Sequence, residues 1–283
     1  MREDQPSATA YRVALRRAAH QILDEPRVLE DPVALRIVGA RAEAAIRAEP
    51  RRYQSGFGRA LRWFLAARSR CAEDALAAAV ATGVAQYVIL GAGLDTFAYR
   101  NPHPAGSLRV FEVDFPATQA WKRKRLEAAG IPLPPSLTFV PVDFETQSLE
   151  EQLAKSGFRA DAPAWFSWLG VSMYLERATA MSTLAFVAGR PPGSGITFDY
   201  LVPPSSMPLL KRLGYYLLAH RLKAAGEPWR TTFEPGELAR ELRALGFTRL
   251  EDLDGEALNQ RYFGGRADRL RGRGLGHVLT ASR

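Results

Sequence analysis

The chain has 283 residues with 47% apolar and 24% charged side chains, and its formal net charge is +8. This length and composition are typical of a folded globular protein with a sizeable core. No apolar run approaches the ~20 residues of a membrane span, and residues 1–6 lack the apolar core of a secretion signal. We therefore expect a cytoplasmic protein without a membrane partner. The one cysteine, Cys71, excludes an intramolecular disulfide and a cysteine-based zinc site.

The positive charge raises the question of a polyanionic partner such as nucleic acid. The basic residues are dispersed along the chain, however, and no binding module with interleaved aromatic residues accompanies them. We interpret them as arginines on exposed helix faces and expect no nucleic-acid partner.

The amino-terminal part is predicted to be helical. Apolar residues recur at helical spacing within residues 8–48, and Asp31 followed by Pro32 indicates a helix start with Asp31 as the cap. A long helix is expected over about 58–81, because Gly83 then provides a carboxyl-terminal stop.

Strand and helix patterns alternate after residue 84. Alternation of this kind indicates a mostly parallel, doubly wound α/β sheet. Strands are expected near 86–91, 108–114, 137–142, 163–170, 195–200, 247–253 and 276–281, the last two as a final hairpin. Helices are expected at 116–129, 147–155 and 176–189, then at 209–220, and last at 232–246.

The most informative segment is residues 86–100, where an apolar run ends in Gly91-Ala92-Gly93. Asp114 follows Gly93 by 21 positions, at the end of a second apolar run. This order is typical of a site for an adenosine-containing cofactor, because glycines allow close backbone approach and an acid can accept hydrogen bonds from ribose hydroxyls. Thr96 stands where a dinucleotide site has a third glycine, which argues against NAD. S-adenosyl-L-methionine, a nucleoside cofactor without phosphates, fits the pattern better.

Residues 90–100, LGAGLDTFAYR, closely resemble the signature of the leucine carboxyl methyltransferase family. This family is a branch of the class I S-adenosylmethionine-dependent methyltransferases, with many bacterial members tied to secondary metabolism. Further motifs in the same order extend the resemblance over nearly the whole chain. They are residues 7–10 with 29–34, 68–74, 111–116 with Lys122, 142–144 and 168–175.

The resemblance implies a class I methyltransferase fold. This fold has a mostly parallel seven-stranded sheet, helices on both faces, an antiparallel final strand and an added helical cover. We expect a single domain over 1–283, with S-adenosyl-L-methionine as the cofactor and no metal. Its parts are an amino-terminal helical cover (1–83), a cofactor-binding half (84–202), a substrate-cover insertion (203–232), and a carboxyl-terminal helix and strands (233–283).

The glycines and the second-strand acid are the first candidates for cofactor binding. The resemblance implies that Gly91 and Gly93 approach the methionine portion with their backbones. Asp114 is expected at the ribose hydroxyls. Glu112 points to the same face of the sheet and is the competing candidate.

The remaining cofactor residues rest mainly on the resemblance. Asp143 and Phe144 correspond to the family's adenine-binding pair, and a helix cap is the alternative role of Asp143. Arg68, rather than Arg70, matches the family arginine, whose guanidinium can bind the cofactor carboxylate through two hydrogen bonds. Leu169 stands where the protein-phosphatase-modifying members have an acid. This departure puts one cofactor contact in doubt and argues against a protein substrate of that kind.

The expected reaction is O-methyl transfer to a small molecule, preferably a carboxylate, in natural-product biosynthesis of polyketide type. A carboxylate is ionised at neutral pH and needs no general base. A phenol would benefit from one, and His220 is then the candidate. Tyr174, just past a strand end, is a candidate catalytic residue of the pocket. A phenolic or amine acceptor, protein carboxyl methylation, and a non-methylating role such as cyclisation remain open.

The acceptor pocket is the least determined part. Aromatic side chains there could stack on a planar acceptor, and an arginine could pair with its carboxylate. Packing between the cover and the sheet is the alternative role of the aromatic residues. The candidates for substrate binding are Tyr11, Tyr200, Tyr216, Trp229 and Arg230. The sequence predicts no oligomeric state.

Overall fold

The structure is a computed structural model, which describes residues 8–143, 146–207, 209–224, 226, 228–265 and 276–283. Five helices precede the first strand, where the sequence predicted helical structure within 8–48 and a long helix over about 58–81. They are α1 (Ala8–Leu23), α2 (Pro32–Val38), α3 (Ala40–Ala48), α4 (Pro50–Gln54) and α5 (Gly56–Ala81). The expected cap of α2 is confirmed, because Asp31 Oδ1 accepts a hydrogen bond from the Ala34 N–H at 3.1 Å. The short α4 was not predicted.

Seven strands form one sheet in the order β3-β2-β1-β4-β5-β7-β6. All pairs are parallel except those of β7, which runs antiparallel to both β5 and β6. The strands are β1 (Gln86–Leu90), β2 (Arg109–Asp114), β3 (Leu137–Pro141), β4 (Trp165–Trp168), β5 (Gly195–Leu201), β6 (Arg249–Leu253) and β7 (Gly276–Ser282). The predicted doubly wound α/β fold is therefore confirmed. Because the chain winds outward in opposite directions from β1, the carboxyl ends of β1 and β4 flank the position where such sheets bind ligands.

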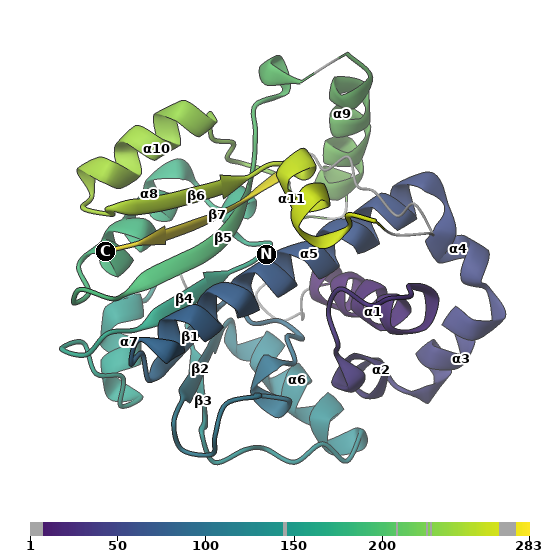
Figure 1. The fold of residues 1–283 in the computed structure, drawn as a ribbon. Helices are drawn as coiled ribbons and strands as arrows, with labels where there is room; N and C mark the ends of the chain where they lie inside the picture. Colours follow the sequence, from purple (N-terminus) through teal and green to yellow (C-terminus); the bar gives the residue numbers. More distant parts are fainter. Residues whose placement is uncertain (1–7, 144–145, 208, 225, 227, 266–275) are drawn as a thin grey trace.

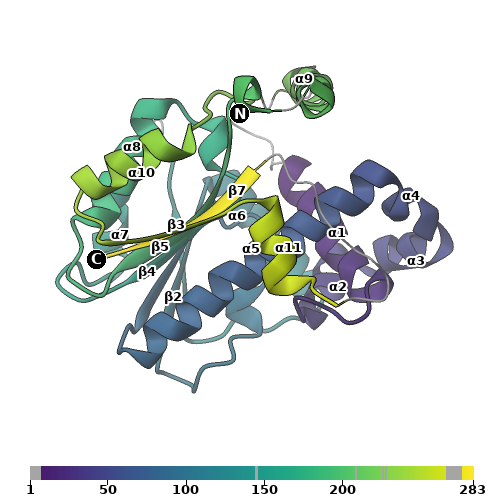
Figure 2. The ribbon, with the colours of Figure 1, turned by 45° about the horizontal axis from the view of Figure 1, so that its top comes forward.

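Helices cover both faces of the sheet (Figure 2). One layer contains α5, α6 (Pro116–Ala128) and α11 (Gly255–Tyr262). The other contains α7 (Leu149–Lys155), α8 (Arg177–Ala188) and α10 (Pro235–Ala244). Although α5 was expected to belong to the amino-terminal cover, it packs on β4, β5 and β7.

The structure corrects the prediction of a simple final hairpin. Strands β6 and β7 do pair, but α11 lies between them in sequence, so 232–246 does not contain the last helix. Asp254 caps α11 by accepting hydrogen bonds from the N–H groups of Glu256 and Ala257. Leu258 then anchors α11 in the core. An Asp-Gly pair is also a turn signal, which is why the start of this short helix was missed.

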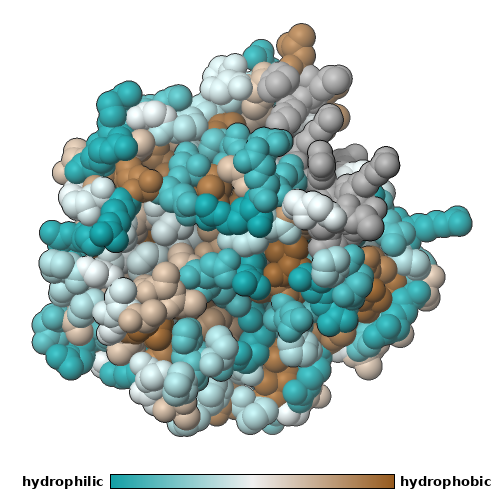
Figure 3. Space-filling view, viewed as in Figure 1, coloured by the Kyte–Doolittle hydropathy of each residue, from teal (hydrophilic) through white to brown (hydrophobic). Residues whose placement is uncertain are grey.

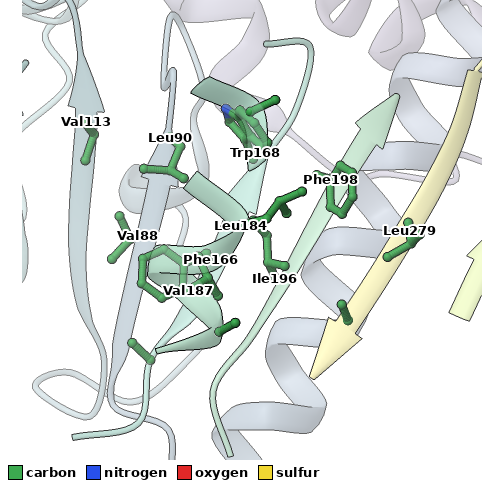
Figure 4. Close-up of a cluster of buried hydrophobic side chains, with 14 of the residues drawn as sticks. Val88, Leu90, Val113, Phe166, Trp168, Leu184, Val187, Ile196, Phe198 and Leu279 are labelled. Atoms are coloured by element: carbon green, nitrogen blue, oxygen red, sulfur yellow. The ribbon is translucent and has the colours of Figure 1, made fainter. Parts of the chain in front are cut away.

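The larger part of the core lies between the sheet and the α7, α8 and α10 layer. Alternate strand residues point into it, as the twofold repeat of a strand requires. In Figure 4, Phe166, Ile196 and Phe198 from neighbouring strands face Leu184 and Val187 of α8. Two 3₁₀ turns, η1 (Phe97–Tyr99) and η2 (Ser172–Tyr174), follow β1 and β4 at the edge where the parallel strands have their carboxyl ends.

Helix α9 (Leu209–Ala224) lies outside both layers (Figures 1 and 2). Tyr215 attaches it to a small apolar cluster that includes Met173, Leu201 and Met207. The side of α9 that faces away from this cluster is exposed. It carries four large apolar residues at helical spacing, Leu209, Leu213, Tyr216 and Leu217.

The face shown in Figure 3 is mostly hydrophilic, with separate apolar spots. No described helix has the length and apolar character needed to cross a membrane.

Candidate functional site

A cleft of about 280 Å³ opens at the carboxyl ends of β1, β2 and β4. Its floor is the glycine loop after β1 and the segment after β4, and α1 and α5 form part of its walls. Residues that follow α9 complete the rim. The cleft lies at the edge where parallel sheets place their ligand sites.

The glycine loop is a backbone cradle that only glycine can form. Gly91 and Gly93 have φ angles of 68° and 48°, which residues with a side chain rarely adopt. A Cβ at Gly91 would lie 2.3 Å from Val171 Cγ2, and one at Gly93 would lie 3.1 Å from Ala10 Cβ. The loop is fixed to the second strand, because the N–H groups of Gly91 and Ala92 donate to the Val113 carbonyl.

Asp114, and not Glu112, reaches the cleft. The Asp114 carboxylate accepts hydrogen bonds from the backbone N–H groups of Gly93 and Phe115. Burial raises the pKa of Asp114, while these two N–H groups and the nearby Lys122 charge act in the opposite direction. Glu112 is fully buried below the cleft, with its Oε2 2.6 Å from Lys122 Nζ.

Asp143 also lines the cleft, and its Oδ2 accepts a hydrogen bond from the Thr146 hydroxyl at 3.0 Å. The alternative role as a helix cap is wrong for α7, because Ser148 caps that helix. Phe144 lies outside the described residues.

Arg68, and not Arg70, lines the cleft. Its Nη1 donates to Asp199 Oδ2 at 2.7 Å. Its Nε is buried and has no hydrogen-bond partner among the described residues. Arg70 is exposed on α5 and pairs with Asp74 one turn later. Leu169 lines the cleft as well, without the acid found in some relatives.

A buried ion cluster joins α1 to the glycine loop, and the sequence did not predict it. Arg17 Nη1 donates to Asp95 Oδ2 at 2.6 Å, and its Nη2 donates to Asp31 Oδ2 at 2.8 Å and to Thr96 Oγ1 at 3.0 Å. Burial would raise the pKa of Asp95, but Arg17 and other positive charges hold it at about 2. Asp95 could have been noticed, because it lies inside the glycine-loop motif. Arg17 had no local signal.

Two of the predicted acceptor residues line the cleft, namely Tyr174 in η2 and Arg230 beyond α9. Arg230 Nη1 donates to Glu176 Oε1 at 3.0 Å. The two side chains are 44% and 67% exposed, so the pair is accessible at the rim.

The structure does not bring the other predicted residues to the cleft. Tyr200 is fully buried and donates its hydroxyl to Asp252, because its position in β5 points into the sheet core. Tyr11 packs edge-on against Trp121, at a centroid distance of 6.2 Å. Trp229 packs on Tyr215 at 5.0 Å. His220 and Tyr216 are exposed on α9.

The described residues contain no group of three or more His, Cys, Asp or Glu side chains placed to bind a metal ion.

Comparison with known proteins agrees with this geometry. The sequence profile of the leucine carboxyl methyltransferase family matches residues 10–188. YktD of Bacillus subtilis, named for S-adenosyl-L-methionine-dependent methyl transfer, is 33% identical over 95% of both chains. A Parafrankia protein named in the same way is 37% identical over 48% of this chain and 44% of its own.

Solved structures agree on the fold. A protein from Thermobifida fusca described as a methyltransferase matches with a TM-score of 0.57 and 17% identity, over 100% of this chain and 96% of its own. A DUF574 family protein from Streptomyces avermitilis matches with a TM-score of 0.53 and 14% identity, over 99% of both chains.

The sheet order, the antiparallel β7 and the cleft beside the glycine loop define a class I S-adenosyl-L-methionine-dependent methyltransferase. Within that class, the chain belongs to the leucine carboxyl methyltransferase family. The predictions of enzyme class, family and cofactor are therefore confirmed.

Proposed function

We propose that the cleft binds S-adenosyl-L-methionine along its length and directs methyl transfer to an oxygen of a small-molecule acceptor, preferably a carboxylate. The observation that carries this proposal is the set of groups brought to one cleft. Arg68 and the glycine loop are suited to the methionine end, Asp114 to the ribose and Asp143 to the adenine.

The residues present fit this cofactor in two respects. Gly91 and Gly93 line the cleft and have no side chain, so a ligand can approach their backbone closely. The buried Nε of Arg68 lacks a partner in the described part of the protein, and a buried polar group of this kind is expected to meet one in the bound state.

The chemistry asks little of the protein beyond alignment. S-adenosyl-L-methionine supplies a methyl group on a sulfonium, and a carboxylate acceptor is already ionised near neutral pH. The walls then contribute proximity and exclusion of water. None of the four histidines is among the described lining residues, and this favours a carboxylate over a phenol that needs a base.

Arg230 is the proposed partner of the acceptor carboxylate. Its ion pair with Glu176 is solvent-exposed, and exposed pairs contribute no more than about 1 kcal/mol. Arg230 can therefore exchange Glu176 for an acceptor carboxylate at small cost. Tyr174 lies on the same side of the cleft and would bound the acceptor.

A calorimetric titration tests the cofactor site. Wild-type protein should bind S-adenosyl-L-methionine and S-adenosyl-L-homocysteine, and Asp114→Asn should lose affinity by roughly tenfold or more, because a charge-assisted hydrogen bond contributes about 1.5–3 kcal/mol. The control is Asp161→Asn, since Asp161 is an exposed acid that pairs with the neighbouring Arg159 and does not line the cleft. Unchanged affinity in Asp114→Asn would contradict the ribose assignment.

The acceptor class is tested by the stability of the product. After reaction with methyl-labelled cofactor and a set of candidate acids, phenols and amines, the label should be released by mild base, because methyl esters hydrolyse and aryl ethers do not. Label retained in base would support a phenol or amine acceptor instead. Label in a protein fraction would indicate a protein acceptor, and conversion of a substrate without formation of S-adenosyl-L-homocysteine would indicate a non-methylating reaction.

A further inference from the structure

Asp199 is a buried acid beside the cleft, to which the reaction described above gives no role. It lies near the carboxyl end of β5 and is 1% exposed. Its Oδ2 accepts a hydrogen bond from Arg68 Nη1 at 2.7 Å, and its Oδ1 accepts one from the backbone N–H of Gly170. Its backbone carbonyl accepts a third from the Ser172 hydroxyl at 2.7 Å. A buried carboxylate bonded in this way is held in one orientation.

Arg68 is fixed on several sides, but the Nε on one of its edges is buried without a hydrogen-bond partner among the described residues. Nη1 is taken by Asp199, and the ring of Phe64 lies 5.9 Å from the guanidinium carbon. Gly170 packs so closely that a Cβ there would lie 2.9 Å from Nη2. The Nε–Nη2 edge offers two parallel N–H groups, the arrangement that binds a carboxylate most strongly.

Asp199 lies beside the end of β4. Strands β4 and β5 pair in parallel with Trp168 opposite Phe198, so the next residues, Leu169 and Asp199, lie side by side. The side chain of Leu169 has no polar group, and the N–H of Gly170 donates to the carboxylate of Asp199 on the neighbouring strand. Asp199 therefore joins the segment after β4 to Arg68.

We propose that Asp199 is a positioning residue that presents the Nε–Nη2 edge of Arg68 to the carboxylate of the cofactor's methionine end. Asp199 touches neither cofactor nor acceptor and acts through Arg68 and Gly170. The inference rests on the proposed function, in which Arg68 binds that carboxylate. It adds that the orientation of Arg68, and with it the preference for a ligand bearing a carboxylate, depends on Asp199.

The test compares two ligands that differ in one group. S-adenosyl-L-methionine has the carboxylate, and decarboxylated S-adenosylmethionine lacks it. Asp199→Asn keeps the shape of the side chain but removes its charge. We expect this variant to lose roughly tenfold in affinity for S-adenosyl-L-methionine and to change less than about threefold for the decarboxylated ligand, because only the first uses the charge-assisted pair. Equal losses for both ligands, or no loss for either, would overturn the proposal.

Two variants control for folding. Asp24→Asn removes another buried acid, whose partners Arg62 and His20 are not among the described lining residues of the cleft, and it should leave the affinity ratio unchanged. Gly170→Ala leaves Asp199 intact and forces a Cβ against Nη2, so it should reproduce the selective loss if Asp199→Asn does not fold. Full affinity of Gly170→Ala for S-adenosyl-L-methionine would contradict the proposal.

Arg68→Ala distinguishes carboxylate binding by Arg68 from the positioning role of Asp199. If this variant keeps the wild-type ratio of affinities, the assignment of Arg68 to the cofactor carboxylate is wrong. If it loses the ratio while Asp199→Asn keeps it, Arg68 binds the carboxylate without help from Asp199, and only the positioning role fails.

Discussion

Glu112 shows how a single buried charge can affect the pH dependence of the whole protein. The side chain is fully buried, and only one of its oxygens contacts Lys122 Nζ. The other, Oε1, has no hydrogen-bond partner among the described residues. Burial raises the pKa of Glu112 to about 7, although Lys122 acts in the opposite direction.

The free energy of unfolding should therefore fall as pH rises from about 4.5 to about 7 and level off above that, because the folded state binds the extra proton only within this window. The total contribution is about 3 kcal/mol at about 1.4 kcal/mol per pKa unit. Glu112→Gln should remove this slope in urea unfolding measured at pH 5, 6, 7 and 8. The exposed Glu256→Gln is the control, and an unchanged slope in Glu112→Gln would show that Glu112 stays ionised throughout.

Functional residues whose contacts are close in sequence could be predicted, and those whose partners are distant in sequence could not. Gly91, Gly93 and Asp114 stand out because a strand followed by a turn is a local pattern. The preference for Asp114 over Glu112 came from the family resemblance, and the buried pair of Glu112 with Lys122 gives its structural reason. Arg17 could not be identified, because its partner Asp95 is 78 positions away and nothing in an alanine-rich helix indicates a distant carboxylate.

At the scale of elements, α9 is a helix with one face attached and one face exposed. Tyr215 and Tyr216 are neighbours in sequence, but they are 8% and 56% exposed. Tyr215 contacts the apolar cluster beneath the helix, and Tyr216 lies in the exposed stripe with Leu213 and Leu217.

Tyr215→Ala should lower the free energy of unfolding by about 2–4 kcal/mol, because it removes a buried aromatic side chain. Tyr216→Ala should change it by no more than about 0.5 kcal/mol, as is usual for a surface position. The denaturant midpoints of the two variants, measured side by side, check this difference. Similar midpoints would mean that α9 is not seated on the cluster through Tyr215.

The elements themselves were largely predictable. The strands could be predicted from apolar runs, because central strands such as β1 and β5 are buried on both faces, and the long helices could be predicted from their apolar spacing. Helices α4 and α11 were missed because five or eight residues carry too little repeat to be distinguished from a turn. It was harder to predict which side of a helix faces the cleft. Tyr11 was expected at the acceptor but points to Trp121, while its neighbours Ala10 and Val13 line the cleft.

At the scale of the whole molecule, the amino-terminal helix forms one wall of the cleft. The Cβ of Ala10 lies 3.1 Å from the position that a Cβ on Gly93 would take, and Arg17 binds Asp95 on the same side. Release of S-adenosyl-L-homocysteine should therefore require α1 to move.

Arg17→Lys should accelerate release of S-adenosyl-L-homocysteine several-fold, because an ammonium cannot reproduce the separate bonds of the guanidinium to Asp31 and Asp95. Stopped-flow displacement measures this rate. The matched control is Arg16→Lys, since Arg16 Nη1 donates to the Arg12 carbonyl in its own helix. Equal release rates in the two variants would show that α1 does not limit escape of the product.

Because β7 runs antiparallel to β5, the carboxyl terminus lies at the edge of the sheet opposite the cleft. Ser282 pairs with Gly195 at the start of β5, whereas the cleft lies beyond the ends of the parallel strands. Figure 1 shows the carboxyl terminus at that opposite edge. Thr9 and Ala10, at the start of α1, line the cleft itself. An affinity tag or a sensor-chip linkage joined after Arg283 therefore leaves the ligand entrance free.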